Sequence, residues 1–270
     1  MIQLFDTHTH FDLVDFDHDR DQLVNMAKQN GVEHLLLIGI AQPHFAKMLA
    51  VHDNLNQLNK TIKIHIAPGL HPFYIQQHEL QHLNDLEHIL KTRHCAAIGE
   101  IGLDTFLPQH KQTAIIQQQQ SFFAAQLELA TSYHKPIALH IRKAHAQVLA
   151  MLKQHRFKNA GIAHAFSGGI EEAKAFIQLG FKIGITGQIT NLNAKKLRQV
   201  VEKIGFEHLV IETDCPDMTP LCCQNSTTQR TRNVPANLVY VLNELATIFA
   251  QPKEKIAQKL WENSFQVLDI

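Results

Sequence analysis

Near its N-terminus the chain reads Ile2-Gln3-Leu4-Phe5-Asp6-Thr7-His8-Thr9-His10, an apolar, strand-like run that leads directly into His-Thr-His. On an extended backbone, residues two positions apart face the same side, so His8 and His10 can both reach one metal ion. The triplet alone is weak evidence in a chain with 19 histidines, because a solvated or hydrogen-bonded histidine is the commoner outcome. Its weight depends on where the other residues of metal-ligand type stand.

Short apolar or β-branched runs alternate with longer amphipathic segments along the chain. The strand-like runs are 2–5, 34–38, 62–66, 95–98, 137–141, 161–163, 182–185 and 208–211. A helix-like stretch follows each run, most clearly at 112–134, 145–155, 170–179, 193–204 and 234–250. Eight such units, with no linker or repeat between them, predict a single domain over residues 1–270. The predicted fold is the α/β fold of a (β/α)8 or TIM barrel, whose usual size is about 250 residues. A doubly wound open sheet is the alternative, and periodicity alone does not exclude it.

Candidate metal ligands stand at or just beyond the ends of five of these runs. They are His8, His10, Glu100, His140, His164 and Asp214. The C-terminal ends of barrel strands converge on one mouth, whereas an open sheet would hold its first and last strands far apart. The spread of the candidate ligands along the chain therefore favours the barrel, with the active site at the C-terminal ends of the strands.

Acids in apolar surroundings point to a cation at this mouth. Glu100 stands between Gly99 and Gly102 after an apolar run, where a buried carboxylate is costly unless a cation offsets its charge; a loop acid of this kind is otherwise simply solvated. Glu212 and Asp214 stand two positions apart on the last strand, so both are able to point into the mouth. Two inward carboxylates repel each other, which makes a cation or a shared proton necessary.

Groups suited to phosphate stand beside the candidate ligands. Arg142 shares a strand face with His140 and can bind a phosphate or pair with a neighbouring acid. Segment 164–169, His-Ala-Phe-Ser-Gly-Gly, leads into a helix whose N-terminal amides can accept an anionic oxygen, and a plain N-cap at Ser167 is the alternative. Three aromatic residues in strand-end loops can stack on an unpaired base or pack on the barrel rim: Phe73, Tyr74 and Phe106.

The composition is that of a folded protein without a global charge. Lys plus Arg and Asp plus Glu number 25 each, so no overall positive field attracts nucleic acid and phosphate recognition must be local. No apolar run approaches the ~18 residues of a membrane span, and we expect no signal peptide. The four cysteines lack a paired Cys-x-x-Cys spacing, and adjacent Cys222 and Cys223 are poor disulfide partners. We expect a cytoplasmic protein that has no membrane contact and acts as a monomer.

Over essentially the whole chain, the sequence resembles the TatD family of metal-dependent hydrolases, a branch of the amidohydrolase superfamily. The segments that carry the resemblance are Asp6-Thr7-His8-Thr9-His10, Gly69-Leu70-His71-Pro72, Gly99-Glu100-Ile101-Gly102-Leu103-Asp104, His140-Ile141-Arg142, His164-Ala165-Phe166-Ser167-Gly168, Glu212-Thr213-Asp214-Cys215-Pro216, Arg232-Asn233-Val234-Pro235 and Asn263. Segment 217–231 is individual to this chain, and we expect it to form a loop that touches substrate.

The resemblance implies a site for two divalent metal ions. His8, His10 and Asp214 would bind one ion, and His140 and His164 the second. Glu100 would bridge the two ions, and a mixed set of histidine and carboxylate ligands suits Mg, Mn or Zn.

The candidate catalytic residues are Asp214, Glu100 and Glu212. Asp214 would orient or deprotonate the attacking water, and Glu212 would orient a ligand. The candidates for contact with the phosphate or the leaving group are His71, Arg142 and Arg232.

The resemblance and the arginines favour a deoxyribonuclease of the 3′–5′ exonuclease type, which cleaves phosphodiester bonds with a water activated at the two-metal site. A metal-dependent acyl or amide hydrolase, such as a D-aminoacyl-tRNA deacylase, is the alternative, because the same centre can attack a carbonyl. A non-catalytic metal-binding protein is disfavoured because all six ligands and Glu212 are present. The neutral overall charge fits a single strand or a DNA end better than a long duplex.

Overall fold

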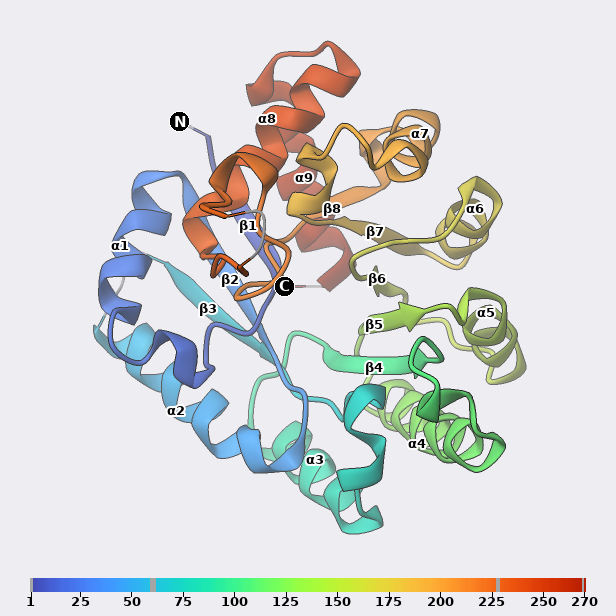
Figure 1. The fold of residues 1–270 in the computed structure, drawn as a ribbon. Helices are drawn as coiled ribbons and strands as arrows, with labels where there is room; N and C mark the ends of the chain where they lie inside the picture. The colour runs from blue at the N-terminus through green and yellow to red at the C-terminus, as the bar shows by residue number, and fades with distance from the viewer. Residues whose placement is uncertain (1, 59–61, 227–228, 269) are drawn as a thin grey trace.

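The computed structural model describes residues 2–58, 62–226, 229–268 and 270. In this part of the chain, eight parallel strands surround a common centre and the helices lie outside them (Figure 1). The strands are β1 (Leu4–Thr9), β2 (Val32–Ile38), β3 (Lys63–Ala67), β4 (Ile98–Asp104), β5 (Ile137–Arg142), β6 (Gly161–Ala163), β7 (Phe181–Ile185) and β8 (Leu209–Ile211). Neighbouring strands pair in parallel within two ladders, β1-β2-β3 and β4-β5-β6-β7-β8.

Hydrogen bonds join the two ladders at both seams. At the seam between β3 and β4, the N–H of Ala96, two residues before β4, donates to Ile66 O over 2.9 Å. Between β8 and β1, the Thr7 hydroxyl donates to Ile211 O over 3.1 Å. The first and last strands therefore lie side by side, which an open doubly wound sheet does not allow. The predicted (β/α)8 barrel is confirmed.

Helices follow the strands around the outside of the barrel. The α-helices are α1 (Arg20–Gln29), α2 (Gln42–Leu58), α3 (Leu80–Thr92), α4 (Thr113–Ser132), α5 (His145–Gln154), α6 (Ile170–Gln178), α7 (Lys195–Ile204), α8 (Leu238–Phe249) and α9 (Lys253–Leu268). The 3-10 helices are η1 (Val14–Phe16), η2 (Pro72–Gln77), η3 (Gln109–Lys111), η4 (Gly187–Thr190), η5 (Phe206–His208), η6 (Leu221–Cys223) and η7 (Pro235–Asn237). Among the described residues, no helix is long and apolar enough to cross a bilayer.

The helix α9 was not among the elements that the sequence predicts, and it covers the N-terminal end of the barrel. Its residues Val267 and Leu268 are buried in the same apolar cluster as Phe5 of β1 and Val210 of β8. Figure 1 shows the C-terminus at the centre of the ring of strands. This apolar floor leaves the opposite end of the barrel as the place for a functional site.

The fourth strand differs from its prediction. The sequence predicts it at 95–98 with Glu100 just beyond its end, whereas β4 runs from Ile98 to Asp104 and contains Glu100. The reason is the role of Gly102, which has a φ of 142°. A Cβ at this position would lie 2.1 Å from His140 O, so the glycine allows β5 to pack closely against β4 instead of forming a turn.

Candidate metal centre

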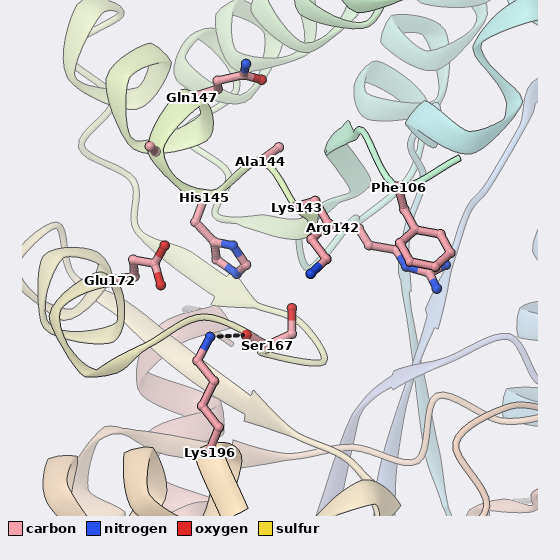
Figure 2. Close-up of a pocket in the computed structure, with 10 residues that line it drawn as sticks. Phe106, Arg142, Lys143, Ala144, His145, Gln147, Ser167, Glu172 and Lys196 are labelled. Atoms are coloured by element: carbon pink, nitrogen blue, oxygen red, sulfur yellow. Dashed lines mark hydrogen bonds between the residues drawn. The ribbon is translucent and has the colours of Figure 1, made fainter. Parts of the chain in front are cut away.

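All six candidate ligands lie at the open end of the barrel. They are His8 and His10 at the end of β1, Glu100 in β4, His140 in β5, His164 after β6 and Asp214 after β8. Five of them line a cavity of about 510 Å³, and His8 is buried beside them. A neighbouring cavity, drawn in Figure 2, shares Arg142 and Ser167 with this one. The ligands meet because the C-terminal ends of barrel strands share one rim.

Glu100 is the centre of the cluster, and its two carboxylate oxygens face different histidines. Oε2 lies 3.1 Å from His8 Nε2 and 3.6 Å from His10 Nε2. Oε1 lies 2.6 Å from His140 Nδ1 and 3.9 Å from His164 Nε2. One oxygen thus faces the pair of histidines from β1, and the other faces the pair from β5 and the end of β6.

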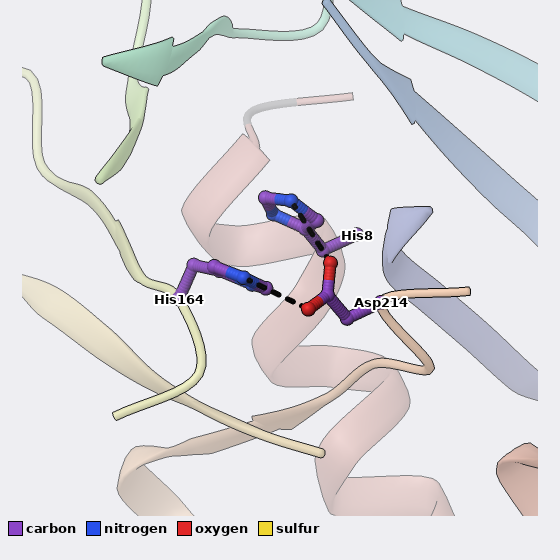
Figure 3. Close-up of side chains that lie close together, drawn as sticks. All are labelled: His8, His164 and Asp214. Atoms are coloured by element: carbon purple, nitrogen blue, oxygen red, sulfur yellow. Dashed lines mark ion pairs between the residues drawn. The ribbon is translucent and has the colours of Figure 1, made fainter. Parts of the chain in front are cut away.

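Asp214 reaches histidines of both pairs. Its Oδ1 lies 3.5 Å from His10 Nε2, and its Oδ2 lies 3.6 Å from His164 Nε2. Figure 3 shows its carboxylate directed at the stacked rings of His8 and His164, whose centroids are 3.4 Å apart. The φ of Asp214 is 54°, in the left-handed region, so the chain turns sharply at this residue.

The donor set fits divalent metal ions. Imidazole nitrogens and carboxylate oxygens together suit Mg, Mn or Zn. Among the described residues, three overlapping groups of such atoms each lie within 4.8 Å of one another, and every candidate ligand belongs to at least one group. Glu100 and Asp214 are only 2% and 7% exposed, so their negative charges need a cation nearby. The histidines can supply that positive charge by taking up protons, and a metal ion can supply it in their place.

The pKa values in the cluster reflect this competition. Burial raises the pKa of Glu100, but the surrounding histidines outweigh burial and hold it well below its usual range. Burial lowers the pKa of His140, but Glu100 leads the groups that outweigh it and raise the pKa to about 9. For His164, Glu212 leads the groups that outweigh burial and raise the pKa well above its usual value. Without metal, both histidines therefore hold protons at neutral pH, and a metal ion must displace them.

Two buried acids stand behind the histidines. Asp104 Oδ2 lies 3.0 Å from His140 Nε2, and Glu212 Oε1 lies 2.9 Å from His164 Nδ1. In both cases the acid contacts the ring nitrogen that faces away from Glu100. A carboxylate in this place fixes the orientation of a ligand histidine and raises its basicity. Sequence reasoning gave Asp104 no role, although it stands four residues after Glu100 on the same face of β4.

Glu212 does not line the metal cavity, although the sequence allows it to point into the mouth of the barrel. The strand β8 ends at Ile211, so strand alternation no longer sets the directions of Glu212 and Asp214. Glu212 is fully buried and accepts the N–H of Ala165 over 2.7 Å. A Cβ at Gly184 of β7 would lie 2.4 Å from its Oε1, so this glycine leaves the space that Glu212 fills.

Two glutamines of α4 hold the segments that carry His71 and Asp104. Gln126 accepts the N–H of Leu70 over 2.8 Å and donates to Leu70 O over 3.2 Å. Gln119 makes the same pair of bonds with the backbone of Asp104, each 2.9 Å long. Both side chains are buried. Sequence reasoning missed them, because nothing local distinguishes a buried glutamine that serves a distant backbone from an exposed one.

His71 lines the cavity beside Glu100. Its Nδ1 accepts the N–H of Phe73 over 2.9 Å, and its Nε2 lies 3.3 Å from Glu100 Oε1. Burial lowers the pKa of His71 to about 4, so the ring is neutral at pH 7. Because Nδ1 accepts a hydrogen bond, we assign the single ring proton to Nε2, the nitrogen that faces Glu100 Oε1.

The two candidate arginines have different surroundings. Arg142 lines the cavity and stacks on Phe106, with its Cζ 3.7 Å from the ring centroid. Within the described residues, no carboxylate forms an ion pair with it. Arg232 lies outside the lining of the cavity. Its Nη1 lies 3.1 Å from Asp19 Oδ1, and its Nη2 lies 2.5 Å from Asp19 Oδ2. Its Cζ lies 5.1 Å from the Phe16 ring centroid. The guanidinium of Arg232 is therefore occupied in joining two surface segments.

The loops around the mouth match the sequence predictions in part. Phe73 and Tyr74 line the metal cavity, whereas Phe106 lines the neighbouring one. From segment 217–231, Asp217 and Met218 line the metal cavity, and residues 227–228 lie outside the described part of the chain. The N-cap of α6 is Gly169 and not Ser167.

Comparisons with known proteins identify the family to which the chain belongs. A family model described as TatD related DNase matches residues 5–269. An uncharacterized metal-dependent hydrolase of Haemophilus influenzae is 36% identical over 270 residues, which cover 98% of this chain and 99% of the relative. A 3′-5′ ssDNA/RNA exonuclease TatD of Pantoea vagans is 28% identical, with 97% of each chain covered. The crystal structure of YjjV, a TatD homologue from Escherichia coli, matches with a TM-score of 0.88 at 33% identity and covers 99% of this chain and 98% of its own. This chain belongs to the TatD family of metal-dependent hydrolases.

Proposed function

We propose that this hydrolase is a 3′–5′ exonuclease that cleaves phosphodiester bonds in single-stranded DNA with the help of two divalent metal ions. The observation that carries the proposal is the division of the histidines around Glu100, with one carboxylate oxygen facing each pair. The name of the relative from Pantoea vagans supports the choice of a single-stranded nucleic acid and of the direction.

The two halves of the cluster are suited to different ions. His8, His10 and Asp214 would hold one ion, and His140 and His164 the other, with Glu100 between them. Divalent ions in such a site polarise phosphoryl oxygens and lower the pKa of a water, which is the chemistry that phosphodiester hydrolysis needs. Asp104 and Glu212 would keep the second pair of histidines oriented.

Three side chains of the cavity would act on the attacking water or on the substrate. Burial raises the pKa of Asp214, but His164 leads the groups that outweigh burial and lower it, so this carboxylate is ionised at neutral pH and can accept a proton from the attacking water. Arg142 can neutralise a phosphate oxygen, because its guanidinium has no carboxylate partner within the described residues. His71 lines the same cavity, and its Nε2–H, which lies 3.3 Å from Glu100 Oε1, can be shared with a second phosphate oxygen.

The cavity also suits a flexible strand better than a duplex. Phe73 and Tyr74 offer aromatic surfaces beside the metal cluster, and base stacking on such rings does not depend on sequence. The chain has no net charge, so no overall positive field attracts a long duplex.

The direct test strips the protein with a chelator, restores Mg, Mn or Zn in turn, and follows single-stranded DNA labelled at its 5′ end. A ladder of products that shortens one nucleotide at a time would support a 3′–5′ exonuclease. Glu100→Ala and Asp214→Asn should abolish this ladder, and Glu100→Ala should also lower the bound metal content. Glu171→Gln is the matched control, because the side chain of Glu171 is 84% exposed.

Other outcomes would overturn the proposal in different ways. Full activity of Glu100→Ala would show that this carboxylate does not bridge two metal ions. Intact DNA, together with amino acid released from a D-aminoacyl-tRNA in a parallel reaction, would move the function to acyl-bond hydrolysis while leaving the metal centre in place.

A further inference from the structure

A second cavity, of about 560 Å³, adjoins the metal cavity at the ends of β5 and β6. The two cavities share Arg142 and Ser167, so Arg142 stands in the wall between them. Figure 2 shows the start of α5, the loop before α6 and the start of α7 around this space. None of the candidate metal ligands lines it, so the metal centre does not account for its chemistry.

Positive charge predominates around this second cavity. Lys143 and Lys196 stand on opposite sides of it, and Arg142 stands at its edge (Figure 2). Within the described residues, no carboxylate forms an ion pair with any of these three groups. Lys196 Nζ donates to Ser167 O over 3.1 Å, which leaves further N–H groups for a ligand. The acid in the lining, Glu172, already accepts the N–H of Gly169, the N-cap residue of α6.

His145 is the buried polar group of the cavity. It begins α5, is only 8% exposed, and packs edge-on against Phe166 with ring centroids 5.5 Å apart. Its Nε2 is buried and has no hydrogen-bond partner in the described part of the chain. Figure 2 shows the ring directed into the space between Lys143 and Ser167. A buried ring nitrogen without a partner is costly, which favours a ligand that can bond with it.

The lining therefore combines two lysines, a shared arginine and an unpartnered imidazole around one space. Phosphate oxygens are strong acceptors for such donors, because a charged donor or acceptor strengthens the hydrogen bond. Arg142 is held in place by its stacking on Phe106. It lines both cavities, so the two spaces are suited to two successive phosphates of one strand.

We propose that this cavity binds the backbone phosphate next to the one that is hydrolysed. The inference rests on the proposed nuclease function, because a polynucleotide is the substrate that carries a second phosphate beside the scissile one. Lys143, His145 and Lys196 would hold that phosphate, and Arg142 would stand between it and the metal centre. Contacts of this kind position a strand without reading its sequence, so the effect should be the same for every base.

The test compares wild-type protein with the double variant Lys143→Ala/Lys196→Ala on two single-stranded oligonucleotides. One carries phosphate at every linkage, and the other has a neutral methylphosphonate at the linkage 5′ to the scissile bond. Loss of a charge-assisted contact should lower kcat/KM of the double variant about tenfold on the all-phosphate strand. The methylphosphonate should lower kcat/KM of the wild type by a similar factor and leave the double variant almost unaffected, because its contact is already missing.

Salt dependence gives an independent readout. For single strands, the logarithm of affinity falls with the logarithm of salt concentration by a slope of about 0.7 for each phosphate neutralised. The double variant should therefore lose about 0.7 of this slope. Lys153→Ala is the matched control, because Lys153 is exposed in the last turn of α5, away from the cavity, and its loss should change neither quantity.

Two kinds of result would contradict the proposed phosphate site. A double variant with the kcat/KM and salt slope of wild type, or an equal methylphosphonate effect in both proteins, would overturn the second phosphate site. Sensitivity to an added 3′-terminal phosphate instead of the internal methylphosphonate would assign the cavity to a strand end and would also overturn it.

Failure of the nuclease proposal is separable from failure of this site. If the wild type cleaves neither DNA nor the simple phosphodiester bis(p-nitrophenyl) phosphate, the proposed function is wrong. Fluorescence anisotropy of a labelled oligonucleotide then decides the binding site alone: about tenfold weaker binding by the double variant than by Lys153→Ala supports it, and equal binding overturns it.

Discussion

Replacing Gln126 with leucine would show whether α4 holds the loop that carries His71. Gln126 and Leu70 are each 1% exposed, so water does not reach the two hydrogen bonds that join them. Leucine has a similar size, but it leaves both the N–H and the C=O of Leu70 without a partner. Each unpaired buried group costs about 1–3 kcal/mol, which gives a loss of about 2–6 kcal/mol for the pair. Burial of the apolar leucine offsets part of this loss, so we expect a value in the lower half of the range.

Equilibrium unfolding in urea measures this free energy, and metal-free protein is used so that metal binding does not add to it. Gln117→Leu is the matched control, because Gln117 is exposed on the same helix and its replacement should change the free energy of unfolding by no more than about 0.5 kcal/mol. Metal-loaded Gln126→Leu should also have a lower kcat/KM, because His71 follows Leu70 directly. A free energy of unfolding within about 0.5 kcal/mol of wild type would refute the reasoning.

Three further predictions concern the metal centre and the arginines. Asp104→Ala should weaken metal binding about 10- to 100-fold, because His140 loses the carboxylate that orients it; a metal titration with unchanged affinity would contradict this role. His140, with a pKa of about 9, and His164, whose pKa lies well above its usual value, both hold protons in the metal-free protein. Metal must displace both protons, so metal affinity should rise about a hundredfold per pH unit below pH 9. Titrations at several pH values check this, and an affinity independent of pH would exclude it. Arg142→Ala should lower kcat/KM on DNA about tenfold or more and leave the free energy of unfolding almost unchanged. Arg232→Ala should leave kcat/KM almost unchanged and lower the free energy of unfolding by about 1 kcal/mol. Kinetics and urea unfolding check both variants, and the reverse pattern would mean that the two arginines have each other's roles.

The strand β4 and the arginines illustrate where sequence patterns mislead. A glycine near a strand end usually signals a turn, but Gly102 instead allows the close approach of β5, and the strand continues through Glu100 to Asp104. Arg142 and Arg232 both stand in motif-like segments of the sequence. Arg142 reaches the cavity and Arg232 does not, because Arg232 meets Asp19, a residue more than two hundred positions away in the chain.

The residues that hold or orient the ligands were harder to predict from the sequence than the ligands themselves. Asp104 had a usable signal, because it shares a strand face with Glu100. Gln119 and Gln126 had none, because each bonds to a backbone segment in another part of the barrel. Glu212 was recognised as relevant, but its direction depended on where β8 ends.

The sequence by itself determined the barrel and the set of candidate ligands. Both depend on local patterns: alternating strand-like and helix-like segments, with histidines and acids at strand ends. Only the tertiary structure decided which oxygen of Glu100 faces which histidine, which acids stand behind the ligands, and that a second basic cavity adjoins the first. The physical reason is that these features are contacts between strands and loops far apart in the chain, and packing alone sets their distances and directions.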